Sequence, residues 1–133
     1  MTSLRQNATA GYRWLTFVFF VGVVVQFFLA GLGVFGLDAG STLDDQSSLD
    51  PHRVLGSVLM AIALVLLLLL LVARPTRHVF VPYLVLIVLT IVQQFLAAGN
   101  ELLGGLHGLS AIAIFSLAGY LGHRAFRREV SAR

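Results

Sequence analysis

Cysteine and lysine are both missing from the sequence, and only 11% of its 133 residues are charged. Without cysteine there are no disulfides, thiolate metal ligands or cysteine nucleophiles. A soluble domain carries about 25% charged residues, and a hydrophobic content of 58% is too high to be buried inside a water-soluble fold of this length. The composition therefore predicts an integral membrane protein surrounded by a lipid bilayer.

All of the basic residues are arginines, and they bring the formal net charge to +3. A basic balance also occurs in proteins that bind nucleic acid. In this chain the arginines flank apolar segments, which indicates a role in membrane orientation. We therefore expect no nucleic acid partner.

Acidic residues are absent from the interior of the long apolar segments. A proton pump or a transporter driven by carboxylate titration needs such a residue within the membrane, so these classes are not expected. The sequence also has no phosphate-binding loop and no metalloprotease helix. Nothing in it indicates an enzyme that acts on its own.

Four apolar segments are long enough to cross a bilayer as helices, which takes roughly 20 residues each: residues 14–36, 54–73, 79–98 and 102–122. We therefore predict an all-α fold, a single membrane domain built as a bundle of four transmembrane helices. An acidic loop at residues 37–51 connects the first two spans, and a basic tail follows the last span at residues 123–133. Asp50 is expected to cap the second helix, with Pro51 at its first position.

The arginines are distributed unevenly about these spans. All but Arg53 lie on the side that holds both termini: Arg5, Arg13, Arg74, Arg77, Arg124, Arg127, Arg128 and Arg133. The opposite side carries an acidic set: Asp38, Asp44, Asp45, Asp50 and Glu101. Because cytoplasmic loops carry an excess of arginine and lysine, we predict a multi-pass protein of the inner membrane of a prokaryote with both termini in the cytoplasm.

A short repeat relates the first and third spans. Residues 24–31 read VVQFFLAG and residues 92–99 read VQQFLAAG, with five of eight positions identical at an offset of 68. In this register Gln26 corresponds to Gln94, and the next span of each pair carries a histidine near its outer end. We therefore predict two tandem helix-pair repeats related by an axis along the membrane normal. The alternative is chance similarity between apolar segments, although glutamine at membrane depth is uncommon.

The polar residues of the spans are expected to share one layer in the outer half of the membrane, because such residues usually face the interior of a bundle. His52 and His107 would face each other there, and two opposed imidazoles are what a six-coordinate haem iron requires. Gln26 and Gln94 would support this site from the other two helices. Three small residues would leave room for a flat macrocycle: Gly56, Gly108 and Ala111. Arg53, at the outer rim, would pair with a propionate of the haem. The sequence thus predicts a protein that binds haem b and acts as an electron-transfer or accessory subunit of a membrane redox complex.

Each of these residues also has a structural interpretation. A histidine at a helix start, such as His52, is commonly hydrated or caps the helix, and Gly104 and Gly108 have the spacing of a helix-packing face. Gln26 and Gln94 can simply form hydrogen bonds between helices. The alternatives to a haem protein are therefore a structural accessory subunit without a cofactor, and a small quinone-binding or carrier module.

Two further histidines, His78 and His123, are expected at the cytoplasmic end of the bundle. A second haem would need its ligand on the same face of the fourth helix as His107. At about 100° per residue, His107 and His123 point to nearly opposite sides of that helix. We therefore predict one haem at most.

The sequence around the two outer histidines also resembles known families. The end of the first span, the stretch His52-Arg53-Val54-Leu55-Gly56 and the pair Leu106-His107 resemble a family of short prokaryotic four-helix membrane proteins of unknown function, over the whole chain. More distantly, His52-Arg53-x-x-Gly56 resembles the histidine-bearing helix of one half of haem A synthase, a four-helix unit that holds a b-type haem between two histidines. This resemblance implies haem ligation by His52. It does not imply the synthase's oxidation chemistry, because Leu49-Asp50-Pro51 stands where that family has a glutamate before the histidine.

Overall fold

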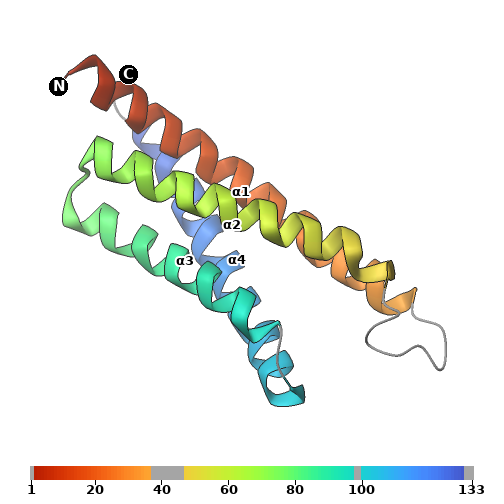
Figure 1. The fold of residues 1–133 in the computed structure, drawn as a ribbon. Coiled ribbons are helices and arrows are strands. Elements are labelled where there is room, and N and C mark those ends of the chain that lie inside the picture. The colour runs from red at the N-terminus through yellow and green to blue at the C-terminus, as the bar shows by residue number, and fades with distance from the viewer. Residues whose placement is uncertain (1, 37–46, 98–99, 131–133) are drawn as a thin grey trace.

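A computed structural model describes residues 2–36, 47–97 and 100–130 of the chain. It contains four long helices, with a 3-10 turn, η2 (Ser47–Leu49), ahead of the second: α1 (Ser3–Phe35), α2 (Asp50–Ala73), α3 (Arg77–Leu96) and α4 (Glu101–Val130) (Figure 1). The described residues include no strand. The predicted all-α fold of four helices is confirmed.

All four helices are long and apolar enough to cross a membrane. The 20 residues of α3 give a helix about 30 Å long, which equals the thickness of the hydrocarbon core. The 33 residues of α1 give about 50 Å. The structure extends the first predicted span back to Ser3 and the fourth forward to Val130. At the end of the bundle that holds the termini, these two helices therefore continue beyond the apolar segments predicted to span the membrane.

Each helix packs against its chain neighbours, and α4 closes the ring against α1. The connections between α2 and α3 and between α3 and α4 are short, which makes neighbouring helices antiparallel. Both termini therefore lie at one end of the bundle (Figure 1). At the opposite end, the α1–α2 pair and the α3–α4 pair diverge (Figure 1).

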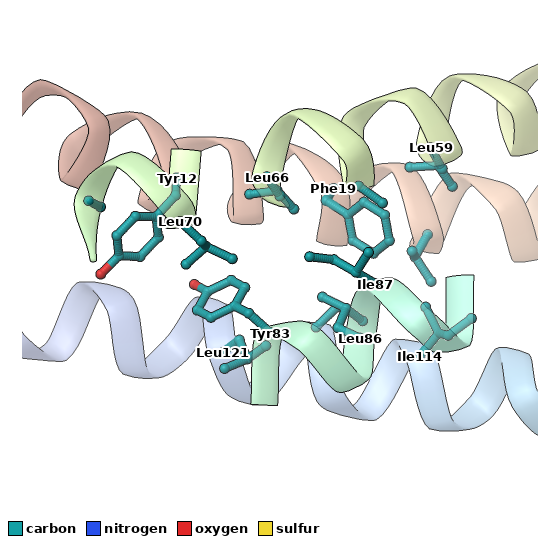
Figure 2. Close-up of a cluster of buried hydrophobic side chains, with 14 of the residues drawn as sticks. Tyr12, Phe19, Leu59, Leu66, Leu70, Tyr83, Leu86, Ile87, Ile114 and Leu121 are labelled. Atoms are coloured by element: carbon teal, nitrogen blue, oxygen red, sulfur yellow. The ribbon is translucent and has the colours of Figure 1, made fainter. Parts of the chain in front are cut away.

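The hydrophobic core fills the bundle between its middle and the end that holds the termini. Phe19, Leu66 and Leu86 are fully buried there, at 0% exposure, and Figure 2 shows them among apolar side chains from all four helices. This packing joins the two helix pairs before they diverge.

One polar contact crosses the core diagonally from α1 to α3. The Thr16 hydroxyl lies 2.6 Å from the Tyr12 carbonyl oxygen and 2.9 Å from the Tyr83 hydroxyl. Because the carbonyl can only accept, Thr16 donates to it and accepts from Tyr83. The rings of Tyr12 and Tyr83 meet edge to face with centroids 5.5 Å apart (Figure 2).

Two arginines of α1 bind carbonyl oxygens near the ends of other helices. The Arg5 guanidinium donates to the carbonyl of Ala73, the last residue of α2. Arg13 donates to the Ala125 carbonyl near the end of α4. At Ala73, the cation satisfies a free carbonyl of the last turn of α2 and opposes the negative end of its dipole. The Ala125 carbonyl lies inside α4, which continues to Val130. These arginines therefore also hold the bundle together.

The start of α2 differs from the prediction. Leu49 is the residue that precedes the first helical turn, Asp50 is already helical, and no side chain caps this end. The turn η2 leads directly into α2, so the Asp50 carboxylate lies outside capping position and accepts a hydrogen bond from Arg53 at 3.1 Å. Of the predicted loop at 37–51, residues 37–46 lie outside the described residues, and the rest form η2 and the first turn of α2.

Candidate functional site

A cavity of about 320 Å³ lies between the helices at the end away from the termini, where the two pairs diverge. All eight predicted site residues line it: Gln26, His52, Arg53, Gly56, Gln94, His107, Gly108 and Ala111. They come from all four helices. Several of the residues that line it are small: Ala30, Gly56, Ala97, Gly108 and Ala111.

In the first helix pair, His52 and Gln26 bind each other's backbone. The Gln26 amide nitrogen donates to the His52 carbonyl oxygen at 2.8 Å, and His52 Nδ1 lies 3.1 Å from the Gln26 carbonyl oxygen. Two reciprocal bonds thus tie the first turn of α2 to α1. We call this arrangement the outer clasp of the first pair.

The same arrangement recurs in the second pair, between His107 of α4 and Gln93 of α3. The Gln93 amide nitrogen donates to the His107 carbonyl oxygen at 3.1 Å, and His107 Nδ1 lies 3.1 Å from the Gln93 carbonyl oxygen. In addition, the Gln93 amide nitrogen lies 3.1 Å from His107 Nε2, and Ser110 donates to the Gln93 side-chain oxygen. This is the outer clasp of the second pair.

The clasps determine which ring nitrogen of each histidine carries the proton. A backbone carbonyl only accepts hydrogen bonds, so Nδ1 of both His52 and His107 must be the donor. In the neutral ring, Nε2 then presents its lone pair. The contact with Gln93 agrees with this assignment, since an amide nitrogen can only donate to His107 Nε2.

The two imidazoles meet across the bundle. The ring centroids of His52 and His107 are 6.3 Å apart, with an angle of 63° between the planes. The backbones of α2 and α4 are not in contact with each other. The two imidazoles therefore approach each other through the cavity. The sequence prediction that the two histidines share one layer agrees with this geometry.

Gln94 has a different role from the one that the repeat predicts. Its amide nitrogen donates to the Gly56 carbonyl oxygen at 3.1 Å, joining α3 to α2, and it is not paired with a histidine. A Cβ at Gly56 would lie 3.1 Å from Gln26 Nε2 and 3.8 Å from Gln94 Nε2. Glycine at this position therefore lets two glutamine side chains approach the same turn of α2.

Gln26 has one atom without a partner. Its side-chain oxygen Oε1 is buried and accepts no hydrogen bond from any described residue. A buried polar group without a partner costs about 1–3 kcal/mol. Gln26 lines the cavity, but Oε1 itself has almost no accessible surface, so a donor from a ligand would reach it only after the amide turns.

Arg53 lies at the rim of the cavity and is half exposed. Its guanidinium forms an ion pair with Asp50 at 3.1 Å, and both side chains are more than half accessible. It keeps access to the cavity, which it lines. His78 and His123 are exposed at the other end of the bundle and line no part of the cavity.

Sequence reasoning missed Gln93 and Ser110. An offset of 67 between the first and third spans also gives five identities in the window 24–31, and it aligns Gln26 with Gln93: Val25/Val92, Gln26/Gln93, Phe28/Phe95, Leu29/Leu96 and Ala30/Ala97. The two registers are equally good by identity, and only the hydrogen bonds distinguish them. The bonding pattern favours the register of 67, while the repeat itself stays a prediction.

Comparison with known proteins identifies a family for this chain. The model of the family of unknown function DUF6220 matches residues 26–99, which is more than half of the chain. The chain therefore belongs to this family. The matched part begins at Gln26 and includes His52, Gln93 and Gln94, whereas His107 lies beyond it. No curated protein and no solved structure matches the chain, so the likeness to haem A synthase stays a prediction.

Proposed function

We propose that this member of the DUF6220 family is a small membrane protein that holds one b-type haem between His52 and His107 and passes electrons within a larger membrane redox complex. The observation that supports this function best is the close approach of the two imidazoles at the cavity, each with its Nδ1 hydrogen anchored to a backbone carbonyl. Metal-binding histidines almost always donate their other ring N–H to such a carbonyl, a carboxylate or a water. The anchors orient each ring and leave Nε2 as the ligating atom.

The ring separation is compatible with a shared metal. Imidazole nitrogen binds transition metals at about 2.0–2.1 Å, so two rings on opposite sides of one metal have centroids roughly 6 Å apart. The centroids of His52 and His107 are 6.3 Å apart. The donor set therefore fits an iron that needs two axial imidazoles, and the described residues offer no cluster of three or more histidine or acidic side chains for a bare metal ion.

The space around the histidines suits a flat ligand with an apolar body. The cavity of about 320 Å³ is at the lower end of the range for small-molecule sites, about 300–1,000 Å³. Small residues line it, and the divergence of the helix pairs gives room for it to widen (Figure 1). Arg53 at the rim supplies a cation for carboxylate groups of the ligand.

A haem iron with both axial positions filled supplies one-electron transfer. The residues of this chain bind and orient the group. Gln26 and Gln93 hold the two histidines, the apolar wall excludes water, and Arg53 neutralises negative charge at the rim. The end of the bundle toward the termini has a packed apolar core, so the electron partner is expected at the opposite end, where the cavity lies.

The direct test is a reduced-minus-oxidised absorption spectrum of the protein purified after haem supplementation. We expect Soret and α bands that disappear in His52→Ala, that weaken and shift in His107→Ala, and that are retained unchanged in the control variants His78→Ala and His123→Ala. Absence of the bands in the wild-type protein would overturn the proposal. Bands that survive both outer substitutions would overturn the assignment of the ligands.

Loss of the bands has to be separated from loss of the fold, because each histidine also forms part of a clasp. Far-UV circular dichroism and gel filtration of His52→Ala and His107→Ala should match the wild type. Added imidazole should restore the bands to a folded variant by occupying the vacated axial position. A folded variant that imidazole does not restore would argue against that histidine as a ligand.

We further infer that the end holding the termini faces the cytoplasm, on the basis of the arginines that surround it. Because the chain has no cysteine, single cysteines at Gln6 and Glu101 give clean reporters. In intact bacteria, a membrane-impermeant maleimide should label Glu101→Cys and leave Gln6→Cys unlabelled until the cells are lysed. The reverse pattern would overturn the orientation.

A second candidate ligand is a quinol, and the partnerless oxygen of Gln26 favours it. If the Gln26 amide turns toward the cavity, a quinol hydroxyl can donate to Oε1, which has no partner among the described residues. The quinol ring and tail suit a cavity lined largely by apolar side chains. The Gln93 amide already bonds His107 Nε2. A quinol does not need that nitrogen as a metal ligand, so this bond is compatible with quinol binding. A colourless protein that co-purifies with extractable quinone, and loses it in Gln26→Leu, would favour this candidate. A colourless protein with neither ligand, but with stoichiometric partner subunits, would favour a structural accessory subunit.

A further inference from the structure

The two outer clasps differ at the ligating nitrogen of the histidine. In the first pair, the Gln26 amide donates to the His52 carbonyl, and His52 Nε2 has no hydrogen-bond partner among the described residues. In the second pair, the Gln93 amide donates to both the His107 carbonyl and His107 Nε2, at 3.1 Å each. The lone pair of His107 Nε2 is therefore engaged within the protein, while that of His52 Nε2 is free of such a bond.

Ser110 holds Gln93 in this position. Its hydroxyl donates to the Gln93 side-chain oxygen and also lies 3.0 Å from the His107 carbonyl oxygen. The amide of Gln93 is thus fixed at both its oxygen and its nitrogen. The Gln26 side chain has no counterpart to this support, because its oxygen accepts no hydrogen bond from the described residues.

The bond that orients His107 does not depend on the Gln93 side chain. His107 Nδ1 donates to the backbone carbonyl of residue 93, and any amino acid there keeps that acceptor. The Gln93 side chain can therefore leave Nε2 while the ring stays anchored. Orientation of the histidine and access to its lone pair are controlled by separate groups.

We propose that Gln93 is a displaceable internal competitor for His107 Nε2, held in place by Ser110, which makes His52 the permanent ligand of the site and His107 a switchable one. This inference rests on the proposed haem function and adds its regulation. While Gln93 is bonded to His107, only His52 would hold the group, and a small neutral molecule could bind in place of His107. After Gln93 withdraws, both histidines would hold it.

The test compares Gln93→Leu, which keeps the bulk of the side chain and removes its donor, with wild-type protein. Carbon monoxide added to the reduced, haem-loaded protein measures the fraction of sites with an open axial position. Because one hydrogen bond of this kind shifts an equilibrium roughly 2- to 10-fold, we expect the ratio of open to closed sites to fall by about that factor. Ser110→Ala should shift the ratio in the same direction by a smaller factor.

Ser116→Ala is the matched control. Ser116 lies on the same helix, its side chain is exposed, and its hydroxyl bonds the Ile112 carbonyl one turn earlier. It should leave the ratio unchanged. An unchanged ratio in Gln93→Leu, or an equal shift in Ser116→Ala, would overturn the inference even where the haem bands depend on both histidines.

A second measurement does not need haem. In ¹⁵N-histidine-labelled protein, we expect both outer histidines to show the Nδ1–H form, and the Nε2 resonance of His107 alone to move in Gln93→Leu. If haem fails to bind while this shift is seen, the proposed function fails and the competition for Nε2 stands. If the His107 resonance does not move, the competition itself is wrong.

Discussion

His52 and Gln26 each donate a hydrogen bond to the other's backbone carbonyl oxygen, across the interface of α1 and α2. His107 and Gln93 do the same across α3 and α4. In these reciprocal pairs each acceptor is a backbone atom, so a substitution of Gln26 or Gln93 leaves in place the bond that Nδ1 of the histidine donates. The contribution of each glutamine can therefore be measured separately.

We expect Gln93→Leu to lower the free energy of unfolding more than Gln26→Leu does in the protein without a ligand. Gln26→Leu removes one bond and also removes a buried oxygen that has no partner, so its cost should be close to zero. Gln93→Leu removes bonds to His107 and leaves Ser110 without one acceptor, at a cost of about 1–2 kcal/mol. Thermal unfolding in detergent measures both. Equal costs would show that the two clasps are energetically alike.

A methyl group at Gly56 should crowd Gln26 and make only an ordinary contact with Gln94. The added carbon would lie 3.1 Å from Gln26 Nε2, which is too close unless the amide moves away from the His52 carbonyl. At Gly104, on the outer part of α4, an added Cβ would meet nothing within 4 Å, and replacing a helical glycine by alanine there gains about 0.5–1 kcal/mol.

We therefore expect Gly104→Ala to raise the thermal unfolding temperature and Gly56→Ala to leave it unchanged or lower it. Both substitutions add the same methyl group to a helix and so should give the same gain in helix propensity. The difference between their unfolding temperatures therefore measures the crowding at Gly56. An equal gain in the two would mean that the turn of α2 at Gly56 has more space than the structure shows.

The fold followed from the sequence because lipid leaves few alternatives. In a bilayer every backbone group must be satisfied within the protein, so an apolar segment of about 20 residues forms a helix. The four spans, and the expectation that His52 and His107 share a layer, rest on this constraint. Which helices adjoin which histidine follows in turn from the short connections that make neighbours antiparallel.

The partners of the histidines did not follow from the sequence. Gln93 and Gln94 are adjacent, and a rotation of about 100° between successive helical residues sends one toward α4 and the other toward α2. The two possible registers of the repeat have equal identity, so pattern alone cannot choose between them. The start of α2 at Asp50 was also mispredicted, because the capping rule does not anticipate that a 3-10 turn leads directly into the helix.

The hydroxyl of Tyr83 should contribute measurably to stability. It donates to Thr16, whose own proton is committed to the Tyr12 carbonyl, and it is buried where water cannot replace it. Tyr83→Phe should cost about 0.6 kcal/mol, and at most about 1.7 kcal/mol, the mean and the maximum found for side-chain hydrogen bonds between membrane helices. Tyr120→Phe is the control, because the Tyr120 ring is 52% exposed and its hydroxyl contacts only Arg124 among the described residues. Similar losses in both would place the stabilising contact elsewhere than in the core.

Arg74, between α2 and α3, has backbone angles that glycine adopts at lower cost. Its φ of 49° and ψ of 57° lie in the left-handed region, which costs an ordinary residue about 1–2 kcal/mol. Arg74 closes the end of α2 through backbone hydrogen bonds. Its N–H donates to the Leu70 carbonyl, and its carbonyl accepts from Arg5. Arg74→Gly keeps both and should raise the free energy of unfolding by about 1 kcal/mol. Arg77→Gly, in the first turn of α3, should instead lower it by a similar amount, because glycine is a poor helix former. If both variants lose stability in detergent, the charge of Arg74 outweighs the strain of its backbone.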